Sequence, residues 1–413
     1  MVAVLMVNFD VVNDIVITSK TIFLRCDLNV PVENGVITDD TKIVREMPMI
    51  NYLVKNGARV VLATHLGNPN GNVDEKFSTK IIADYLERRM RCKVHFSEEC
   101  VGEQAKKVIF RASYGEIIVL ENLAFHREEF ACDLNFAQKL SDGINVYVND
   151  TFEISHLPFA SILGVPLFVR ATAGIRLAKE VENLNCIINS EDKTPVIAII
   201  GGNRFSKHVD LINNLVDKVQ YLVLGGTIAN VFLKANGYRI GKSMIEEGFT
   251  DFVFEMHEKA KKSGCNIIFP HDFVVSKNIS LNVNVEVKST DKIVSDDIIV
   301  DVGPIFISLV KDILNTKANV LWHGAMGIYE HVDIGTLDIA KYIAARSRAR
   351  MKKIHSVIGG NDTVKFIKKH NLIDQFSYVS TSGNAFFEYL QGKILPGVEI
   401  LHRLSSYEER KRK

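Results

Sequence analysis

The sequence predicts an α/β protein built on two doubly wound parallel sheets. Its apolar runs, for example Val196–Ile200 and Tyr221–Leu224, are apolar at every position, as a parallel sheet covered on both faces requires. These runs alternate with helical segments of ten or more residues, which predicts right-handed βαβ crossovers. With 413 residues the chain is too long for one core, so we expect two domains of roughly 180 to 210 residues each.

Composition narrows the class of protein. The hydrophobic fraction of 47% and the charged fraction of 24% are those of an ordinary globular protein. A formal net charge of +1 gives no overall attraction to nucleic acid or to an anionic membrane. No apolar run has the length of a membrane span, and the apolar start lacks the basic flank of a signal peptide. The six cysteines are scattered without a C-x-x-C pair, which favours free thiols in a reducing compartment.

In the first half, the expected strands are followed by polar residues. We expect strands at Thr21–Arg25, Arg59–Thr64, Lys93–Phe96, Glu116–Leu120 and Asn145–Val148. Helices are expected at Met47–Lys55 and Lys80–Arg89, and a turn at Asn34-Gly35. Ligands of parallel sheets bind outside the carboxyl ends of the strands. The polar residues after the strands therefore predict a ligand edge formed by Asp27, Asn29, His65, Asn122, Asn149 and Asp150.

The second half repeats this pattern after a helix expected at Gly174–Ile188. The expected strands are Val196–Ile200, Tyr221–Leu224, Asn266–Phe269, Asn319–Trp322, Ser356–Ile358 and Tyr378–Ser380. Several of them run into glycines, namely Gly201-Gly202, Gly225-Gly226, Gly324 and Gly359-Gly360. Glycine-bearing strand ends gathered along one edge predict a cradle for nucleotide phosphates. The polar stretch Lys288–Asp301 is expected to form an excursion or a small hairpin.

The stretch His355–Ile367 holds the candidate metal ligand. It is a short apolar strand, two glycines and a helix that begins near Asp362 and Thr363, so backbone N–H groups face the loop. Asp362 is suited to holding a magnesium ion on a bound phosphate, because Mg²⁺ takes hard oxygen ligands and shares them with the nucleotide. The alternative is a tight connection in which Asp362 is only the N-cap of the helix.

A dozen short motifs follow one another along the chain. They are Arg25–Pro31, Thr64–Pro69, Leu120–Phe125, Val148–Phe152, Ala173-Gly174, Ile200–Gly202, Leu224–Gly226, Ile240–Ser243, Asp301–Pro304, Trp322–Glu330, Gly359–Thr363 and Leu395–Val398. Each is a weak signal alone, but in this order they are specific. From Phe23 to about Val398 the chain resembles the phosphoglycerate kinases.

The resemblance implies two Rossmann-like domains joined by a helix, with hinge-bending between them. It places an N-terminal domain for 3-phosphoglycerate at residues 1–173, the helix at 174–189, a nucleotide-binding domain at 190–395 and a returning segment at 396–413. The implied reaction is reversible phosphoryl transfer between 1,3-bisphosphoglycerate and ADP in glycolysis, giving 3-phosphoglycerate and ATP, with Mg²⁺. The implied protein is a cytoplasmic monomer whose partners are these small molecules, without nucleic acid or membrane.

Site residues are carried over from the resemblance position by position. Lys42 and Arg204 match catalytic cations, and Asp362 matches the metal site. Substrate-binding positions are matched by Arg25, Asp27, Asn29, His65 and His156. Nucleotide-binding positions are matched by Gly201, Gly202, Arg204, His208, Gly225, Gly226, Glu330, Gly359, Gly360, Asn361 and Thr363.

Several cations of the family pattern are replaced. Lys42 stands in place of an arginine, and Asn68, Ala124 and Leu157 replace the arginines of the acid-substrate patch. His208 replaces a lysine. These changes keep two alternatives open. One is a non-catalytic paralogue that keeps the fold and nucleotide binding as a regulatory or binding protein. The other is a kinase for a less anionic acid.

Two further residues bear on the depleted patch. Phe159 replaces a family histidine, so that Ala124, Leu157 and Phe159 would line a more apolar pocket. Arg127, three residues beyond Ala124, is a candidate to supply a missing charge, although it is more simply read as a solvated loop residue beside Glu128 and Glu129.

Overall fold

The computed structural model describes residues 9–189, 194–279, 284–351 and 353–412. The described chain divides into two compact units. The N-terminal unit holds the residues up to Val181 and those from Ile394 on, and the C-terminal unit holds Glu182–Lys393. The expected connecting helix is present as α6 (Ile175–Ile188), which crosses this division.

The N-terminal unit contains a six-stranded parallel sheet of order β5-β6-β4-β1-β7-β8. Its strands are β1 (Thr21–Arg25), β4 (Arg59–Ala63), β5 (Val94–Ser97), β6 (Ile117–Leu120), β7 (Val146–Asn149) and β8 (Arg170–Ala173). The first five lie where the sequence predicts them. The edge strand β8 was not expected, because its four residues hold no bulky apolar side chain.

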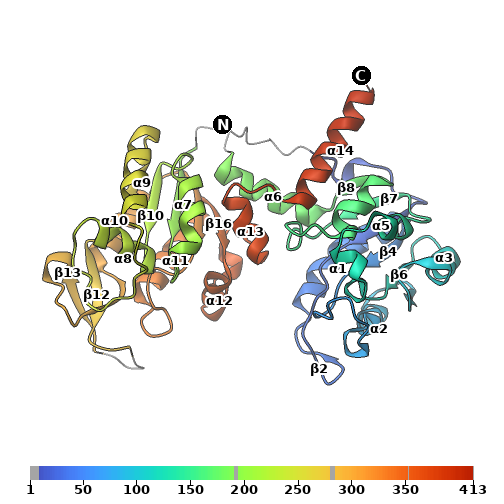
Figure 1. Cartoon of the computed structure of the whole chain (residues 1–413), viewed down its shortest axis with the longest axis horizontal. Helices are drawn as coiled ribbons and strands as arrows, with labels where there is room; N and C mark the ends of the chain where they lie inside the picture. The colour runs from blue at the N-terminus through green and yellow to red at the C-terminus, as the bar shows by residue number, and fades with distance from the viewer. Residues whose placement is uncertain (1–8, 190–193, 280–283, 352, 413) are drawn as a thin grey trace. The chain divides into compact units, whose positions relative to one another are not determined.

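Helices complete the N-terminal unit. They are α1 (Thr41–Lys55), α2 (Lys80–Arg89), α3 (Gly102–Arg111), α4 (Arg127–Phe130), α5 (Leu134–Leu140) and α14 (Pro396–Arg412). Helix α1 begins six residues before the expected Met47 and continues through Pro48. Figure 1 shows α14, in red, beside the green strand β8. The predicted turn at Asn34-Gly35, with both residues at positive φ, joins the short strands β2 (Val32–Glu33) and β3 (Val36–Ile37).

The C-terminal unit contains a second six-stranded parallel sheet, of order β11-β10-β9-β15-β16-β17. Its strands are β9 (Val196–Ile200), β10 (Tyr221–Leu224), β11 (Asn266–Ile268), β15 (Asn319–His323), β16 (His355–Gly359) and β17 (Tyr378–Val379). Every residue of β9 is buried, and Trp322 on β15 is fully buried. The predicted fold class, α/β with two parallel sheets, is confirmed.

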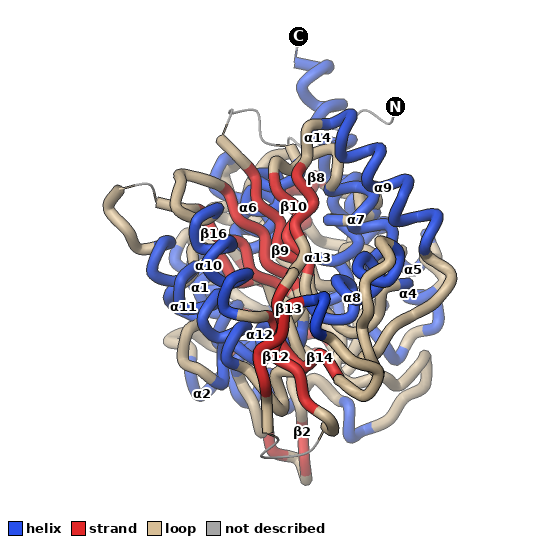
Figure 2. Tube along the Cα trace, turned by 90° about the vertical axis from the view of Figure 1, so that its left-hand side faces the viewer, coloured by secondary structure: helices blue, strands red, loops and turns tan. Residues whose placement is uncertain are grey.

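Helices cover both faces of this second sheet. They are α7 (Val209–Leu215), α8 (Gly226–Ala235), α9 (Thr250–Ser263), α10 (Pro304–Ile313), α11 (Ile334–Ser347), α12 (Asn361–Lys369) and α13 (Gly383–Leu390). Figure 2 shows α10 and α11 on one side of β9 and β10, and α7 and α9 on the other. Coverage on both faces explains why the strands are apolar at every position.

The stretch Lys288–Asp301 does not form a hairpin of its own. Strands β13 (Glu286–Ser289) and β14 (Ile298–Val302) pair antiparallel with the two sides of β12 (Asp272–Ser276), giving a three-stranded sheet of order β13-β12-β14. The hairpin expectation was wrong because the apolar β12 supplies pairing edges for both segments. Its first residue, Asp272, is buried and accepts hydrogen bonds from the backbone of Ile305 and Phe306, both at 2.8 Å.

Replacing Asp272 therefore tests how α10 is anchored. Asp272→Ala leaves two N–H groups of the first turn of α10 without partners, so we expect the C-terminal unit to lose about 1–3 kcal/mol of unfolding free energy. Urea denaturation measures this loss. Asp272→Asn, which keeps one acceptor oxygen, should lose less. Equal stability of the alanine variant and the parent would show that the bonds contribute nothing.

Candidate functional site

Three neighbouring strands of the C-terminal sheet, β10, β9 and β15, end in loops that are hydrogen-bonded to one another. The N–H of Gly201 donates to the carbonyl of His323 at 2.8 Å, and the N–H of Gly202 donates to the carbonyl of Ala325 at 3.0 Å. Gly226 donates to the carbonyl of Met326 at 2.8 Å. The loops after β9, β10 and β15 therefore form one continuous surface at the carboxyl edge.

The hydrogen bonds hold these loops so close together that two of the glycines have no room for a side chain. A Cβ on Gly201 would lie 2.0 Å from the carbonyl oxygen of Ala325, and a Cβ on Gly324 would lie 2.1 Å from the carbonyl oxygen of Gly201. Gly324 also has a φ of 89°, which other residues rarely adopt. Glycine is required at both positions by the close approach of the loops.

A cavity of about 300 Å³ opens at this edge. It is lined by the predicted residues Gly202, Gly226, Glu330 and Asp362, which the structure brings together from two loops and the starts of α8 and α12. Its volume and its mixture of apolar and polar walls suit a small ligand. The other predicted nucleotide-binding residues are not among the residues that line this cavity.

The cavity also has lining residues that were not among the predicted site residues. Met244, Ile299, Met326 and Ile328 give it apolar walls, and the buried Asn230 adds an amide whose Nδ2 donates to the Met244 carbonyl at 2.9 Å. Met326 and Ile328 belong to the motif Trp322–Glu330, but no pattern in the sequence distinguishes Met244, Ile299 or Asn230. Together they form a surface on which a planar, largely apolar group could rest beside the polar loop ends.

Asp362 and Glu330 both line the cavity at this edge, and the charge of each acts on Tyr329. The charges of both carboxylates, together with burial as the larger cause, raise the pKa of Tyr329 to about 12. Helix α12 has Gly360 as its N-cap and Asp362 in its first turn, so the reading of Asp362 as N-cap was wrong. Asp362 is exposed and lines the cavity.

The donor set at Asp362 fits a magnesium ion that shares its ligands with a bound phosphate. Mg²⁺ usually takes one or two carboxylates, with phosphate and water completing the shell. Among the residues that the structure describes, no group of three His, Cys, Asp or Glu side chains could hold a metal ion alone. One exposed carboxylate beside a ligand cavity matches the shared arrangement.

Three of the other predicted nucleotide-binding residues have structural contacts. The hydroxyl of Thr363, which is 1% exposed, accepts a hydrogen bond from the N–H of Gly324 at 2.7 Å. Gly359 faces Phe386, whose ring would lie 2.2 Å from an added Cβ. Gly225 donates its N–H to the carbonyl of Ile200 at 2.9 Å. These contacts fix the shape of the cradle. That Thr363, Gly359 and Gly225 also contact a nucleotide stays a prediction.

Arg204 and His208 lie after β9 and differ in charge. Arg204 is exposed, and its carbonyl oxygen lies 2.7 Å from Nδ1 of His208. Burial lowers the pKa of His208. Burial and the neighbouring His208 lower the pKa of His323 to about 3, and the two rings lie 5.4 Å apart between centroids. Both imidazoles are therefore neutral at pH 7, and Arg204 carries the positive charge here.

At the carboxyl edge of the N-terminal sheet, the predicted substrate residue Arg25 is fully buried. Its Nε donates to Ser161 Oγ at 2.8 Å, and its Nη1 donates to the carbonyls of Cys26 at 2.8 Å and Ala63 at 3.3 Å. Ser161 bonds in turn to the buried carboxylate of Glu129. The guanidinium of Arg25 thus has protein partners on most of its donors.

The other predicted residues of this edge also have protein partners. Lys42, in the first turn of α1, donates to Asp27 at 2.6 Å. Burial would raise the pKa of Asp27, but the Lys42 charge, helped by His65, holds it below its usual range. Asn29 accepts from the N–H of Gly67 at 2.9 Å. Burial, with the charge of Arg25, lowers the pKa of His65 to about 4, so His65 is neutral at pH 7.

Two of the replaced positions of this edge, Ala124 and Phe159, are apolar, whereas Asn68 is polar and exposed. Ala124 is 5% exposed, and the rings of Phe159 and Phe130 meet edge to face with centroids 5.3 Å apart. Arg127 lies against Gly71, and its guanidinium reaches Asn72 at 3.5 Å. The remaining predicted substrate residue, His156, has a buried Nδ1 without a hydrogen-bond partner among the described residues.

A buried acidic cluster lies near this edge. Asp150 was predicted as part of the ligand edge, but its grouping with other acids was not predicted. Arg176, at the start of α6, forms ion pairs with Glu46 and with Glu153. Asp150 accepts from the N–H of Arg176 at 2.7 Å and of Leu177 at 3.2 Å, so it caps α6. Burial raises the pKa of Asp150 to about 7. Glu46 lies far from Asp150 and Glu153 in the sequence, so no local motif marks the three acids as a group.

Comparison with known proteins places the chain among named relatives. Residues 12–393 match the family model described as "Phosphoglycerate kinase". The phosphoglycerate kinase of Orientia tsutsugamushi (strain Ikeda) is 38% identical over 399 residues, covering 96% of this chain and 98% of that protein. The phosphoglycerate kinase of Chelativorans sp. (strain BNC1) is 39% identical over 401 residues, covering 96% of this chain and 100% of that protein.

The solved structures that resemble this chain are also phosphoglycerate kinases. The structure of phosphoglycerate kinase from Coxiella burnetii superposes with a TM-score of 0.89 at 33% identity, covering 96% of this chain and all of that one. The structure of phosphoglycerate kinase from Pyrococcus horikoshii OT3 superposes with a TM-score of 0.74 at 27% identity, covering 96% of this chain and 99% of that one.

The raised pKa of Asp150 gives a pH test of the acidic cluster. The folded protein holds a proton on Asp150 that the unfolded chain releases near pH 4, so stability should fall as the pH rises from about 4 to about 7. Asp150→Asn keeps the capping oxygen and should remove roughly 1–2 kcal/mol of this dependence. Thermal unfolding across this range measures it, with exposed Glu103→Gln as the control. An unchanged pH profile in Asp150→Asn would contradict the assignment.

Proposed function

The chain belongs to the phosphoglycerate kinase family, and from this premise we propose that it interconverts 1,3-bisphosphoglycerate and ADP with 3-phosphoglycerate and ATP, as a step of glycolysis. In the direction of ATP use, a carboxylate oxygen of 3-phosphoglycerate bonds to the γ-phosphorus as the bond between that phosphorus and the β-phosphate oxygen breaks. The products are the acyl phosphate and ADP, and no proton is transferred. The hinge-bending implied by the resemblance is part of this proposal.

The observation that carries the proposal is the cavity at the carboxyl edge of the C-terminal sheet. Its apolar walls would take the nucleoside, and Gly202 and Gly226 would let the backbone approach the phosphates. Glu330 is proposed to contact the ribose, and Asp362 to hold Mg²⁺. When bound, the ion would neutralise developing phosphate charge.

Cations complete the proposed roles. Lys42 and Arg204 are both at least partly exposed, and we assign them to the charge of the transferring phosphoryl group. Phosphoryl transfer is catalysed mostly by positioning and charge stabilisation, so these two residues are expected to matter most. The neutral His208 would contribute less than a charged residue in its place.

A second candidate is a kinase for a less anionic acid, and two observations favour it. The guanidinium of Arg25 is bonded to Ser161 and to backbone carbonyls, and the edge around Ala124 and Phe159 is apolar. Few cations remain there for a phosphate on the acid. The relatives named above all carry the name of the enzyme, so the comparisons give no support to a non-catalytic paralogue.

Two properties remain predictions from the resemblance, the monomeric state and the cytoplasmic location. Within the described residues, none of the helices combines the length and the apolar character that crossing a membrane would need. None of the six cysteines, all of which are described, forms a disulfide.

A coupled assay with Mg-ATP and 3-phosphoglycerate tests the proposal. We expect turnover by the parent and at least a hundredfold lower turnover by Arg204→Ala, because a cation at the transferring group is removed. Lys207→Ala, the neighbouring exposed lysine, is the matched control. Parallel reactions with glycerate test the second candidate. Turnover of neither acid by a protein that Mg-ATP still stabilises would contradict both kinase assignments.

Asp362→Ala tests the metal assignment. Loss of the carboxylate should remove the magnesium dependence of ATP binding and lower turnover by a hundredfold or more. Calorimetric titration of ATP with and without Mg²⁺ measures this, beside Asp312→Ala, an exposed aspartate of α10. Magnesium-dependent ATP binding that survives in Asp362→Ala would show that another group holds the ion.

A further inference from the structure

A second cavity lies at the amino ends of the strands of the C-terminal sheet, opposite the cavity at their carboxyl ends. It has a volume of about 760 Å³ and is lined by residues at the amino ends of β15 and β16, together with the end of α11. Asn319 and His355 are the first residues of those strands. The cavity at the glycine loops lies at the carboxyl ends of the same strands, so the two cavities are separated by the length of the sheet.

The charge of this second cavity is strongly one-sided. Lys317, Arg348 and Lys353 line it, and Asp374 is the single carboxylate among its lining residues. Burial lowers the pKa of His355, whose Nε2 lies 2.9 Å from Asn183 Oδ1, so this imidazole adds no charge at pH 7. The lining therefore carries a net charge of about +2 in a chain whose net charge is +1.

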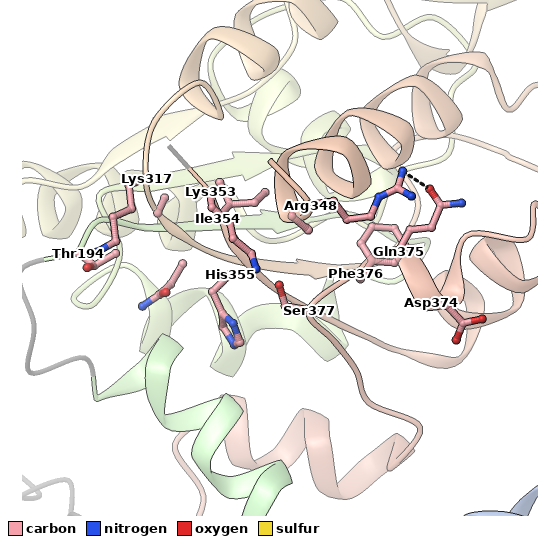
Figure 3. Close-up of a pocket in the computed structure, with 13 residues that line it drawn as sticks. Thr194, Lys317, Arg348, Lys353, Ile354, His355, Asp374, Gln375, Phe376 and Ser377 are labelled. Atoms are coloured by element: carbon pink, nitrogen blue, oxygen red, sulfur yellow. Dashed lines mark hydrogen bonds between the residues drawn. The ribbon is translucent and has the colours of Figure 1, made fainter. Parts of the chain in front are cut away.

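The three cations are available to a ligand. In the part of the chain that the structure describes, none of them forms an ion pair with a carboxylate. Arg348 donates from Nη2 to Gln375 Oε1 at 2.8 Å, which orients the guanidinium and leaves its other donors open. Figure 3 shows Lys317 and Lys353 on one side of the cavity and Arg348, Gln375 and Asp374 on the other.

The helix dipole explains only part of this arrangement. Arg348 is the C-cap of α11, where a positive charge offsets the free carbonyl groups. Lys317 lies four residues beyond the end of α10, and Lys353 lies outside any helix. Beneath the cations, Ala318, Ile354 and Phe376 are buried and give the cavity an apolar floor.

We propose that this cavity binds a small polyphosphate, inorganic or organic, that carries at least two phosphate groups. Because the cations lie on two sides of the cavity, a chain of phosphates can contact the cations of both sides at once. Charge-assisted bonds to phosphate oxygens supply the affinity. The site is distinct from the cradle at the glycine loops and does not depend on the reaction proposed for that cradle.

Calorimetric titration with inorganic tripolyphosphate, in the presence of saturating Mg-ADP, tests the site. Mg-ADP occupies the cradle, so we expect one further binding event in the parent. Lys317→Gln and Lys353→Gln should each weaken that event about tenfold, and the double variant more than tenfold. Lys317→Arg should keep it. A second titration with ATP in place of tripolyphosphate tells an organic ligand, which can use the apolar floor, from an inorganic one.

The matched control is the double variant Lys261→Gln/Lys262→Gln. These exposed lysines lie in the last turn of α9, so they too are at the end of a helix. Helix α9 leads into the edge strand β11, which is separated from β15 and β16 by β10 and β9. The control should bind tripolyphosphate as the parent does. No binding by the parent, or equal binding by the parent and the Lys317/Lys353 double variant, would overturn the proposal. Kinase turnover is measured separately and should be unchanged in all of these variants.

Discussion

The backbone of Gly201 touches the backbone of the loop after β15, with no space for a side chain between them. This contact joins the end of the central strand β9 to the end of its neighbour, and hydrogen bonds extend the joint to the loop after β10. Because three loops are fixed to one another, the cavity that they surround has a rigid rim. The positions of Asp362 and Glu330 are useful only relative to such a rim. The candidate site therefore depends on backbone packing before it depends on any charged group.

The two carboxyl edges use their charges differently. In the N-terminal unit, Arg25 bonds to Ser161 and to carbonyls, and Lys42 is paired with Asp27. Pairing of this kind stabilises the folded state, but it reduces the field that a bound anion would feel. In the C-terminal unit, Arg204 and Asp362 are exposed at the edge of the cradle. A buried cation with satisfied donors is a poor anion receptor, because a ligand must displace partners that are already well placed.

The sequence predicted the fold more fully than the site. Apolar runs and glycine-bearing strand ends are local signals, and they identified most strands and the glycines at which the loops of the C-terminal sheet meet. The strand β8 was missed because its short side chains give no apolar run. The apolar walls of the cavity, such as Ile299, and the acidic cluster around Arg176 were missed for a different reason. Each is assembled from separate parts of the chain, and only the folded backbone shows that the parts meet.

Helix α14 belongs to the N-terminal unit although it is the last element of the chain. The N–H of Gly397 bonds to the carbonyl of Ser155, and Ser405 accepts from the N–H of Asp10 across 395 positions of sequence. During synthesis at roughly 5–20 residues per second, Ser155 leaves the ribosome roughly 10 to 50 s before Gly397 does. During this interval the surface of the N-terminal unit that α14 later covers stays exposed. The unit whose first strands are translated first is thus completed only when α14 has been made.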